Sequence, residues 1–214
     1  MRAARLLIAG LGLLWGIGTA QAQNVRFDVQ NFRPTPGPRD LIIVRGRNYF
    51  PQDIEWVAAD VEGALARAPG VVEELCLRSV AVKAGIVSRD ERESGERALL
   101  NFGHTLGHAL EAEGGFARLT HGEAVSLGMV AMLRVGEALG VTDPAEAARV
   151  VALLDRLGLP VRLDPAALRA ALPFLALDKK RRGGAIRAVL LTRIGEARIH
   201  PLPAEAFPGL LGIG

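Results

Sequence analysis

A histidine-rich stretch between residues 97 and 123 is the feature that most limits which folds and functions this chain can have. It reads RALLNFGHTLGHALE at 97–111 and continues with HGE at 121–123. Three of the four histidines of the 214-residue chain lie there. On one helix, a spacing of three, four and three residues places four polar side chains on one face: Asn101, His104, His108 and Glu111. The residues between them are mostly apolar, so a buried helix must satisfy this stripe, for which a metal ion or a bound anion would serve.

The histidine pair His104 and His108 can converge on one point, because the two rings are four residues apart on a helix. Zn²⁺ takes about three or four N, O or S ligands near 2.0–2.2 Å. Together with His121, this stretch offers three possible metal ligands. Alternatively, two of the histidines bind the metal and the third serves as an acid or base. Thr105 stands where zinc proteases of the His-Glu-x-x-His type have their glutamate. Core histidines held by ordinary hydrogen bonds remain the alternative interpretation.

A second helix is expected to begin at residue 121, because Thr120 and Glu123 form a T-x-x-E capping box. His121 would then lie at the positive end of the helix dipole, which favours the neutral imidazole that binds metal or accepts a proton. An exposed first-turn histidine without a role is the alternative. Gly128 inside this helix costs about 1 kcal/mol relative to alanine, so we expect it to pack closely against another backbone.

Several motifs, taken in order, resemble 3-dehydroquinate synthase. They are KAGIV at 83–87, DERESGER at 90–97, LNFGHTLGHALE at 100–111, HGEAV at 121–125, GM at 128–129 and DKK at 178–180. The resemblance covers about residues 62–214 and matches only the C-terminal domain of that enzyme. It implies a mainly α fold, the helical C-terminal domain of the dehydroquinate synthase-like fold with a small β-hairpin. Other sugar phosphate cyclases share the histidine motifs, and iron-dependent alcohol and glycerol dehydrogenases share the architecture.

The resemblance also implies a function. The family converts 3-deoxy-arabino-heptulosonate 7-phosphate to 3-dehydroquinate and phosphate, a carbon–oxygen lyase step of the shikimate pathway that leads to chorismate and aromatic amino acids. It implies NAD⁺ and a divalent metal, Zn²⁺ or Co²⁺, as cofactors. It further implies a phosphorylated sugar-acid substrate and a cytoplasmic location.

Site residues follow from the resemblance, position by position. His104 and His121 resemble two of the family's metal ligands, and His108 matches the histidine that handles protons near the substrate. The substrate-binding positions of the family match Lys83, Arg97, Asn101 and one of Lys179 or Lys180. Arginine and lysine suit a substrate that carries a carboxylate and a phosphate. Taken singly, these charges are also typical of a solvated face or of nonspecific nucleic-acid contact.

Two parts of the family's site have no recognisable counterpart. Upstream of residue 60, no Gly-rich nucleotide loop follows a strand, so we expect the N-terminal Rossmann-like domain to be absent from this chain. The family's third metal ligand is a glutamate from a helix that precedes the matched part. Neither Glu62 nor Glu73 lies in a copy of that motif. We therefore expect residues 1–214 alone not to turn over the substrate.

The first sixty residues do not resemble this family and have sequence patterns of other kinds. Residues 1–23 have the basic start, apolar run and small-x-small site of a secretory signal peptide, with an apolar run too short for a membrane span. An exported, non-catalytic protein that binds a metal or a partner is therefore one alternative function, and another sugar phosphate cyclase is the second. Residues 24–60 are unassigned, and 37–56 resemble the hinge of acyl-adenylate-forming ligases or, alternatively, hold one buried strand at 41–44. Residues 61–214 are expected to form the helical metal and substrate domain.

Composition limits the remaining classes. Half of the residues are hydrophobic, enough for a core. A formal charge of +3 does not demand a nucleic-acid partner, and none is expected. A homodimer is left open. The single cysteine, Cys76, excludes an internal disulfide, and we expect it to be a small buried hydrophobe.

Periodicity predicts the layout of elements. Helices are expected near 53–67, 71–85, 97–113, 121–139, 144–156 and 165–174. Asp143 is expected to cap the helix that begins at Pro144. A hairpin is expected in 184–200 with its turn at Gly195. His200 lies at a strand end and is given no function.

Overall fold

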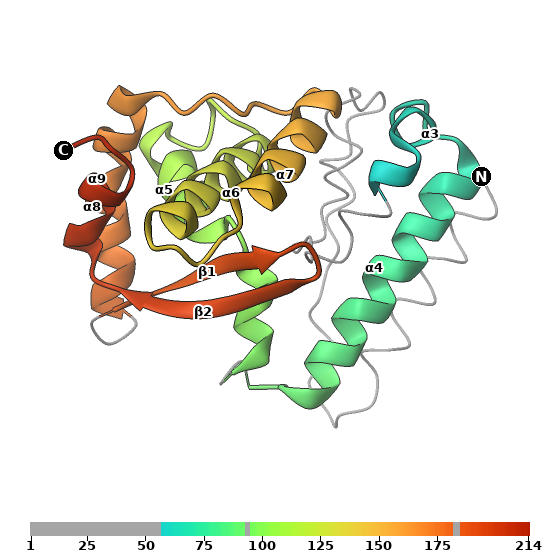
Figure 1. Ribbon diagram of the computed structural model, residues 1–214, viewed down its shortest axis with the longest axis horizontal. Coiled ribbons are helices and arrows are strands. Elements are labelled where there is room, and N and C mark those ends of the chain that lie inside the picture. The colour runs from blue at the N-terminus through green and yellow to red at the C-terminus, as the bar shows by residue number, and fades with distance from the viewer. Residues whose placement is uncertain (1–56, 93–94, 182–184) are drawn as a thin grey trace. The chain divides into compact units, whose positions relative to one another are not determined.

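The structure is a computed structural model that describes residues 57–92, 95–181 and 185–214. The chain divides into two units, Met1–Pro36 and Gly37–Gly214, and the described residues belong to the second. The signal-like leader at 1–23 and the ligase-like segment at 37–56 lie outside the described residues. Figure 1 shows the elements: α3 (Val61–Leu65), α4 (Pro69–Arg89), the 3₁₀ helix η4 (Glu96–Asn101), α5 (His104–Glu113), α6 (His121–Ala138), α7 (Pro144–Arg156), α8 (Pro165–Arg181), strands β1 (Ile186–Arg193) and β2 (Glu196–Leu202), η5 (Ala204–Ala206) and α9 (Phe207–Leu210).

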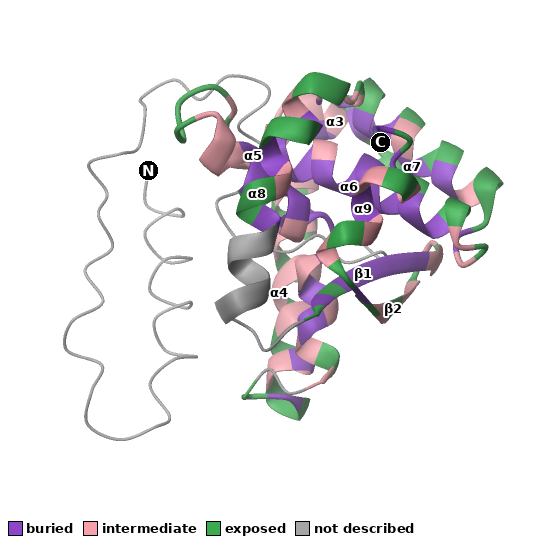
Figure 2. Cartoon of the chain, turned by 90° about the vertical axis from the view of Figure 1, so that its left-hand side faces the viewer, coloured by how far each residue is buried: buried purple, intermediate pink, exposed green. Residues whose placement is uncertain are grey.

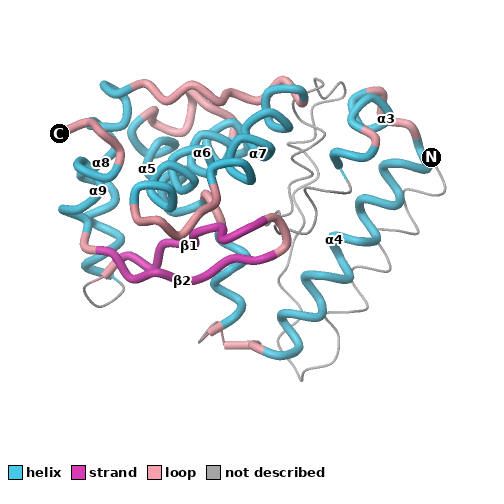
Figure 3. The backbone as a smooth tube through the Cα atoms, in the orientation of Figure 1, coloured by secondary structure: helices cyan, strands magenta, loops and turns pink. Residues whose placement is uncertain are grey.

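The described residues are mainly helical with one β-hairpin, which confirms the expected fold class (Figure 3). The strands β1 and β2 pair antiparallel, with the turn at Gly195, as expected. Helix α5 packs against α6 and α8, and β1 packs against α6. Figure 2 shows that α6 and β1 are largely buried. Their completely enclosed side chains form the centre of the core: Met132, Leu133 and Val135 of α6, and Val189, Leu190 and Leu191 of β1.

The single helix expected at 97–113 is wrong. The 3₁₀ helix η4 ends at Asn101, and α5 begins at His104. Between them Gly103 has a φ of +79°, in the left-handed region that favours glycine. A Cβ atom at this position would lie 2.8 Å from the backbone nitrogen of Met129 in α6. Asn101 therefore does not share a helix face with His104, because the helical conformation is interrupted at Gly103, where α6 approaches the backbone.

Helix α6 begins as the sequence predicts. The Thr120 hydroxyl accepts a hydrogen bond from the Glu123 backbone N–H at 3.4 Å, and the Glu123 carboxylate accepts one from the Thr120 N–H at 2.9 Å. The capping box is thus complete. Asp143 caps α7 as expected, accepting from the Ala145 N–H at 2.7 Å.

Helix α4 is the least buried of the long helices, and Ile86 is its buried residue. Cys76 is half-buried, so the expectation of a buried side chain is wrong. Partial burial still raises the pKa of its thiol, because the thiolate is the form that loses solvation. Among the described residues, every helix is too short or too polar to cross a membrane.

Candidate metal centre

The rings of three histidines meet where α5 passes the start of α6. The ring centroids of His104 and His108 are 5.5 Å apart, and that of His121 is 5.4 Å from the first and 5.7 Å from the second. Two consecutive turns of α5 supply the first pair, and the capping box of α6 places the third. The structure therefore brings together the three histidines that the sequence analysis singled out.

The close crossing of α5 and α6 depends on glycine. A Cβ atom at Gly107 would lie 3.1 Å from the Ala124 carbonyl oxygen and 3.2 Å from the Val125 backbone nitrogen. Gly128 meets the Gly103 carbonyl group in the same way. The two backbones therefore pack without side chains between them, as expected for Gly128, and this brings the histidines of one helix within reach of the other.

His121 lies against the carboxylate of Glu111. Its Nδ1 is 3.2 Å from Oε1 and 3.1 Å from Oε2 of that side chain. The Glu111 side chain is 12% exposed, whereas His121 is 35% exposed. A carboxylate in this place fixes the orientation of the imidazole ring. The sequence pattern places Glu111 on the polar face of the helix without indicating a role for it, and its three-residue spacing from His108 is the signal that could have done so.

The donor atoms here suit a transition-metal ion. One ligand atom from each of His108, Glu111 and His121 lies within 4.8 Å of the other two. Two imidazole nitrogens and one carboxylate oxygen form a ligand set known for catalytic zinc. His104 is 4% exposed, with Nδ1 3.2 Å from the Phe102 carbonyl oxygen. The chemistry of this cluster therefore fits Zn²⁺ or Co²⁺.

The basic and amide side chains expected to hold substrate come from other elements. Lys83 lies on α4, Arg97 and Asn101 lie on η4, and Lys179 and Lys180 lie in the last turn of α8. They are thus contributed by three elements other than the two helices that carry the histidines.

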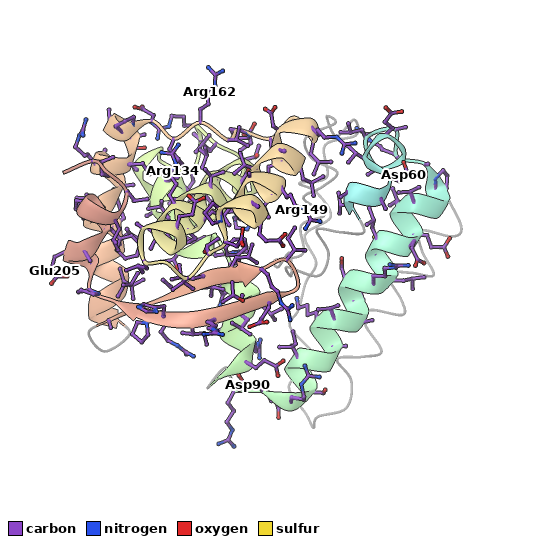
Figure 4. The ribbon with its side chains drawn as sticks, viewed as in Figure 1. Asp60, Asp90, Arg134, Arg149, Arg162 and Glu205 are labelled. Carbon is purple, nitrogen blue, oxygen red and sulfur yellow. The ribbon has the colours of Figure 1, made fainter. Side chains whose placement is uncertain are left out.

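Arg97 is held by the turn between α4 and η4. The buried carboxylate of Asp90 accepts hydrogen bonds from the backbone N–H groups of Gly95 at 2.8 Å and Arg97 at 2.9 Å. The Arg97 guanidinium donates to the Glu91 carbonyl oxygen at 2.6 Å. Figure 4 labels Asp90 at this turn. Asp90 therefore holds the backbone of Arg97, and the Glu91 carbonyl oxygen holds its guanidinium.

The same turn carries a two-contact ion pair. Arg89 donates to both carboxylate oxygens of Glu96, at 2.8 and 2.9 Å. These hydrogen bonds lower the pKa of Glu96 and raise that of Arg89. Because both side chains are well exposed, the pair stabilises the fold only slightly, but it fixes the end of α4 to η4.

A match to a protein-family model shows which family this chain belongs to. The description "3-dehydroquinate synthase C-terminal" belongs to a model that matches residues 47–181, more than half of the chain. This chain belongs to the 3-dehydroquinate synthase C-terminal family. Membership confirms the resemblance found in the sequence and places the chain in the sugar phosphate cyclase superfamily of enzymes.

Solved structures of sugar phosphate cyclases have the same fold. ValA, the 2-epi-5-epi-valiolone synthase of Streptomyces hygroscopicus subsp. jinggangensis 5008 with NAD⁺ and Zn²⁺ bound, is 25% identical with a TM-score of 0.63, covering 74% of this chain and 45% of that chain. A 2-deoxy-scyllo-inosose synthase structure is 21% identical with a TM-score of 0.56, and the match covers 69% of this chain and 41% of that chain. Another structure of 2-deoxy-scyllo-inosose synthase, complexed with carbaglucose-6-phosphate, NAD⁺ and Co²⁺, is 19% identical with a TM-score of 0.56. The match covers 79% of this chain and 49% of that chain. This chain therefore spans less than half the length of each.

Proposed function

We propose that this chain is the metal- and substrate-binding part of a 3-dehydroquinate synthase. The reaction is the conversion of 3-deoxy-arabino-heptulosonate 7-phosphate to 3-dehydroquinate and phosphate, in the shikimate pathway. The observation that carries the proposal is the convergence of His104, His108 and His121, whose ring centroids lie within 5.7 Å of one another. All three histidines belong to the motifs that resemble this enzyme. Family membership supports it.

The proposed roles follow the resemblance. His104 and His121 are two ligands of the metal. A bound divalent metal would polarise the hydroxyl groups around the substrate carbon that NAD⁺ transiently oxidises. His108 is the exposed member of the three, so its ring can exchange a proton with a substrate that arrives from solvent.

The anionic groups of the substrate are assigned to the basic side chains. Arg97 can bind a carboxylate or phosphate through its guanidinium fork, and Lys83 supplies a compact positive charge. Asn101 can donate a hydrogen bond to a substrate oxygen. One of Lys179 or Lys180 completes the set. Arg97 already enters this role partly positioned, because its backbone and guanidinium are both hydrogen-bonded.

We propose NAD⁺ and either Zn²⁺ or Co²⁺ as cofactors, by analogy with the valiolone synthase and inosose synthase structures that hold them. A cytoplasmic location follows from the family resemblance and belongs to the same proposal.

Ligand binding tests the proposal. Calorimetric titration of the full chain, in the presence of Co²⁺, compares 3-deoxy-arabino-heptulosonate 7-phosphate with glucose 6-phosphate. Only the first has a carboxylate, so we expect it to bind at least about tenfold more tightly, a difference of about 1.4 kcal/mol. Arg97→Ala should reduce that affinity. Equal affinity for the two sugars, or an unchanged affinity in Arg97→Ala, would contradict the proposed substrate.

The signal-like sequence of residues 1–23 favours a second candidate, an exported protein that binds a metal or a partner without catalysis. Cell fractionation followed by N-terminal sequencing separates the two. Periplasmic protein cleaved after Ala22 would support export. Cytoplasmic protein that retains Met1 would support the enzyme.

A further inference from the structure

We propose that a pocket between α5, α6 and α8 binds a small molecule that has an apolar body and one carboxylate group. The pocket has a volume of about 220 Å³ and is open to solvent. Among the described residues that line it are none of the three clustered histidines and neither Arg97 nor Asn101. The inference therefore goes beyond the proposed function and does not rest on it.

Leucine side chains form the walls of the pocket. Leu110 of α5 and Leu168 of α8 are the most deeply buried of them, at 2% and 1% exposed. Leu119, Leu127 and Leu163 pack against the core but are only partly buried. A bound apolar group would shield these side chains from water, and the removal of apolar surface from water favours binding.

The volume of the pocket sets the size of that apolar group. A leucine-lined cavity of about 150 Å³ is large enough to hold benzene. Pockets that bind drug-sized molecules are usually larger, at about 300–1,000 Å³, and often lie between the helices of a bundle. A pocket of about 220 Å³ therefore fits a single benzene-sized ring or a short branched chain.

Two exposed arginines line the pocket, and they differ in how far their charge is already neutralised. Arg118 forms an ion pair with Glu113, the last residue of α5, so its charge is largely offset. Arg162 has no carboxylate partner among the described residues, and Figure 4 shows it extending outward. Its guanidinium is thus available to bind a carboxylate through two parallel hydrogen bonds.

Asp164 is the only acid among the described residues that line the pocket, and its carboxylate is engaged by α8. It accepts a hydrogen bond from the Ala166 N–H at 2.9 Å, and the positive end of the helix dipole offsets its charge. The charge that a ligand meets is therefore positive and comes chiefly from Arg162. Such a charge favours an anionic head group over a neutral or a cationic one.

Benzoate titration of the full chain, followed by calorimetry and by ¹H–¹⁵N NMR, tests the pocket. Benzoate joins a benzene ring to a carboxylate, and benzamide is its neutral counterpart of nearly the same shape. We expect benzoate to bind with a Kd of about 1 mM or lower and to shift the amide signals of the lining residues. Benzamide should bind about tenfold more weakly, because it has no charge for Arg162 to meet.

Two substitutions test the two parts of the pocket. Arg162→Ala should weaken benzoate binding by about tenfold and leave benzamide binding unchanged. Ala167→Phe places a ring in the pocket from α8 and should abolish the binding of both. Arg156→Ala, at an exposed position at the end of α7, is the matched control and should bind benzoate as the wild type does. Circular dichroism checks the fold of each variant, and Arg162→Ala decides the test if Ala167→Phe does not fold.

Several results would overturn the proposal. One is the absence of saturable benzoate binding, and another is equal affinity for benzoate and benzamide. Wild-type benzoate affinity in either pocket variant, or an equal loss in Arg156→Ala, would also contradict it. NMR shifts centred on the histidine cluster and Arg97 would place benzoate in the proposed substrate site instead.

Analytical ultracentrifugation of the ligand-free chain tests the other possible occupant, a second copy of the chain. A dimer that Ala167→Phe disrupts would assign the pocket to that copy and would overturn the proposal. A monomer, or a dimer that Ala167→Phe leaves intact, supports a small-molecule ligand. The sugar titrations with Arg97→Ala test the proposed function separately, because Arg97 does not line this pocket.

Discussion

Gly128 of α6 packs directly onto the carbonyl oxygen of Gly103, at the break between η4 and α5. A Cβ atom at Gly128 would overlap that oxygen and lie 2.9 Å from the backbone nitrogen of Gly107. Gly103 meets the same helix from the other side, because its own Cβ would lie 2.8 Å from the Val125 carbonyl oxygen. This contact between backbones sets the distance between α5 and α6, and therefore the distance between His108 and His121.

The substitution Gly128→Ala should separate these helices. We expect it to lower the free energy of unfolding by about 1–3 kcal/mol or more, because a methyl group must displace backbone atoms. The Co²⁺ affinity should fall as well, since the ligands come from both helices. Urea unfolding and cobalt titration measure the two effects. Gly70→Ala in α4 is the control, because no atom lies within 4 Å of its Cβ, and it should be neutral or slightly stabilising.

Asp90→Ala should affect both stability and substrate binding. It leaves the backbone N–H groups of Gly95 and Arg97 without their buried acceptor, at a cost of about 1–3 kcal/mol. The guanidinium of Arg97 should then lose its fixed position, so the affinity for the sugar phosphate should fall. Chemical denaturation and calorimetry are the measurements. Glu91→Ala, which keeps the carbonyl oxygen that Arg97 contacts, should leave both quantities near wild type, and a parallel loss there would argue against the role of Asp90.

Thr120→Ala removes the side-chain cap of α6. We expect a loss of about 1 kcal/mol in the free energy of unfolding, the usual value for an N-cap residue. The Glu123→Ala substitution acts on the same box, so the double variant should lose less than the sum of the two single losses. Thr120→Ser keeps the hydroxyl and should retain most of the stability. Additive losses in the double variant would show that the two side chains do not act as one cap.

Glu146 should make the stability of the fold depend on pH. Its carboxylate accepts from the Ile194 N–H at 2.8 Å and from Arg149, labelled in Figure 4, at 2.7 Å. These contacts, the backbone bond first, lower the pKa of Glu146. The folded pKa lies below the unfolded value of about 4.3, so the contribution is complete above that pH and is lost as the pH falls through the folded pKa.

The substitution Glu146→Gln measures this contribution. At pH 7 we expect the variant to be less stable than wild type by about 0.5–1.5 kcal/mol, the usual range for a hydrogen bond. The difference should shrink as the pH is lowered below about 4. Urea unfolding at a series of pH values gives the profile. Glu137→Gln, on an exposed part of α6, is the control, and a pH-independent difference for Glu146→Gln would contradict the assignment.

Local sequence patterns predicted the elements that local interactions form. The capping box at Thr120, the Asp143 cap and the hairpin turn at Gly195 each depend on residues a few positions apart, and each is present. The helix expected at 165–174 continues to Arg181, and the one expected at 71–85 extends from Pro69 to Arg89. Helix ends that lack a strong capping or breaking residue are set by tertiary contacts, so periodicity alone placed them less well.

The break at Gly103 could not be predicted in the same way. The residues from 97 to 113 have a helical pattern, and glycine within a helix is only mildly unfavourable. The left-handed conformation of Gly103 arises because α6 approaches its backbone, and the residues that approach it are about twenty-five positions away in the sequence. For this reason the helical pattern alone places Asn101 on the wrong helix face.

The sequence by itself determined the family, the mainly helical fold, the hairpin and the identity of the three candidate histidines, because these follow from motif order and short-range periodicity. Only the tertiary structure decided that Glu111 joins the cluster and that Cys76 stays partly exposed. The physical reason is that a ligand set and a degree of burial depend on which helices cross and how closely. Here that separation is fixed by the packing of Gly103, Gly107 and Gly128.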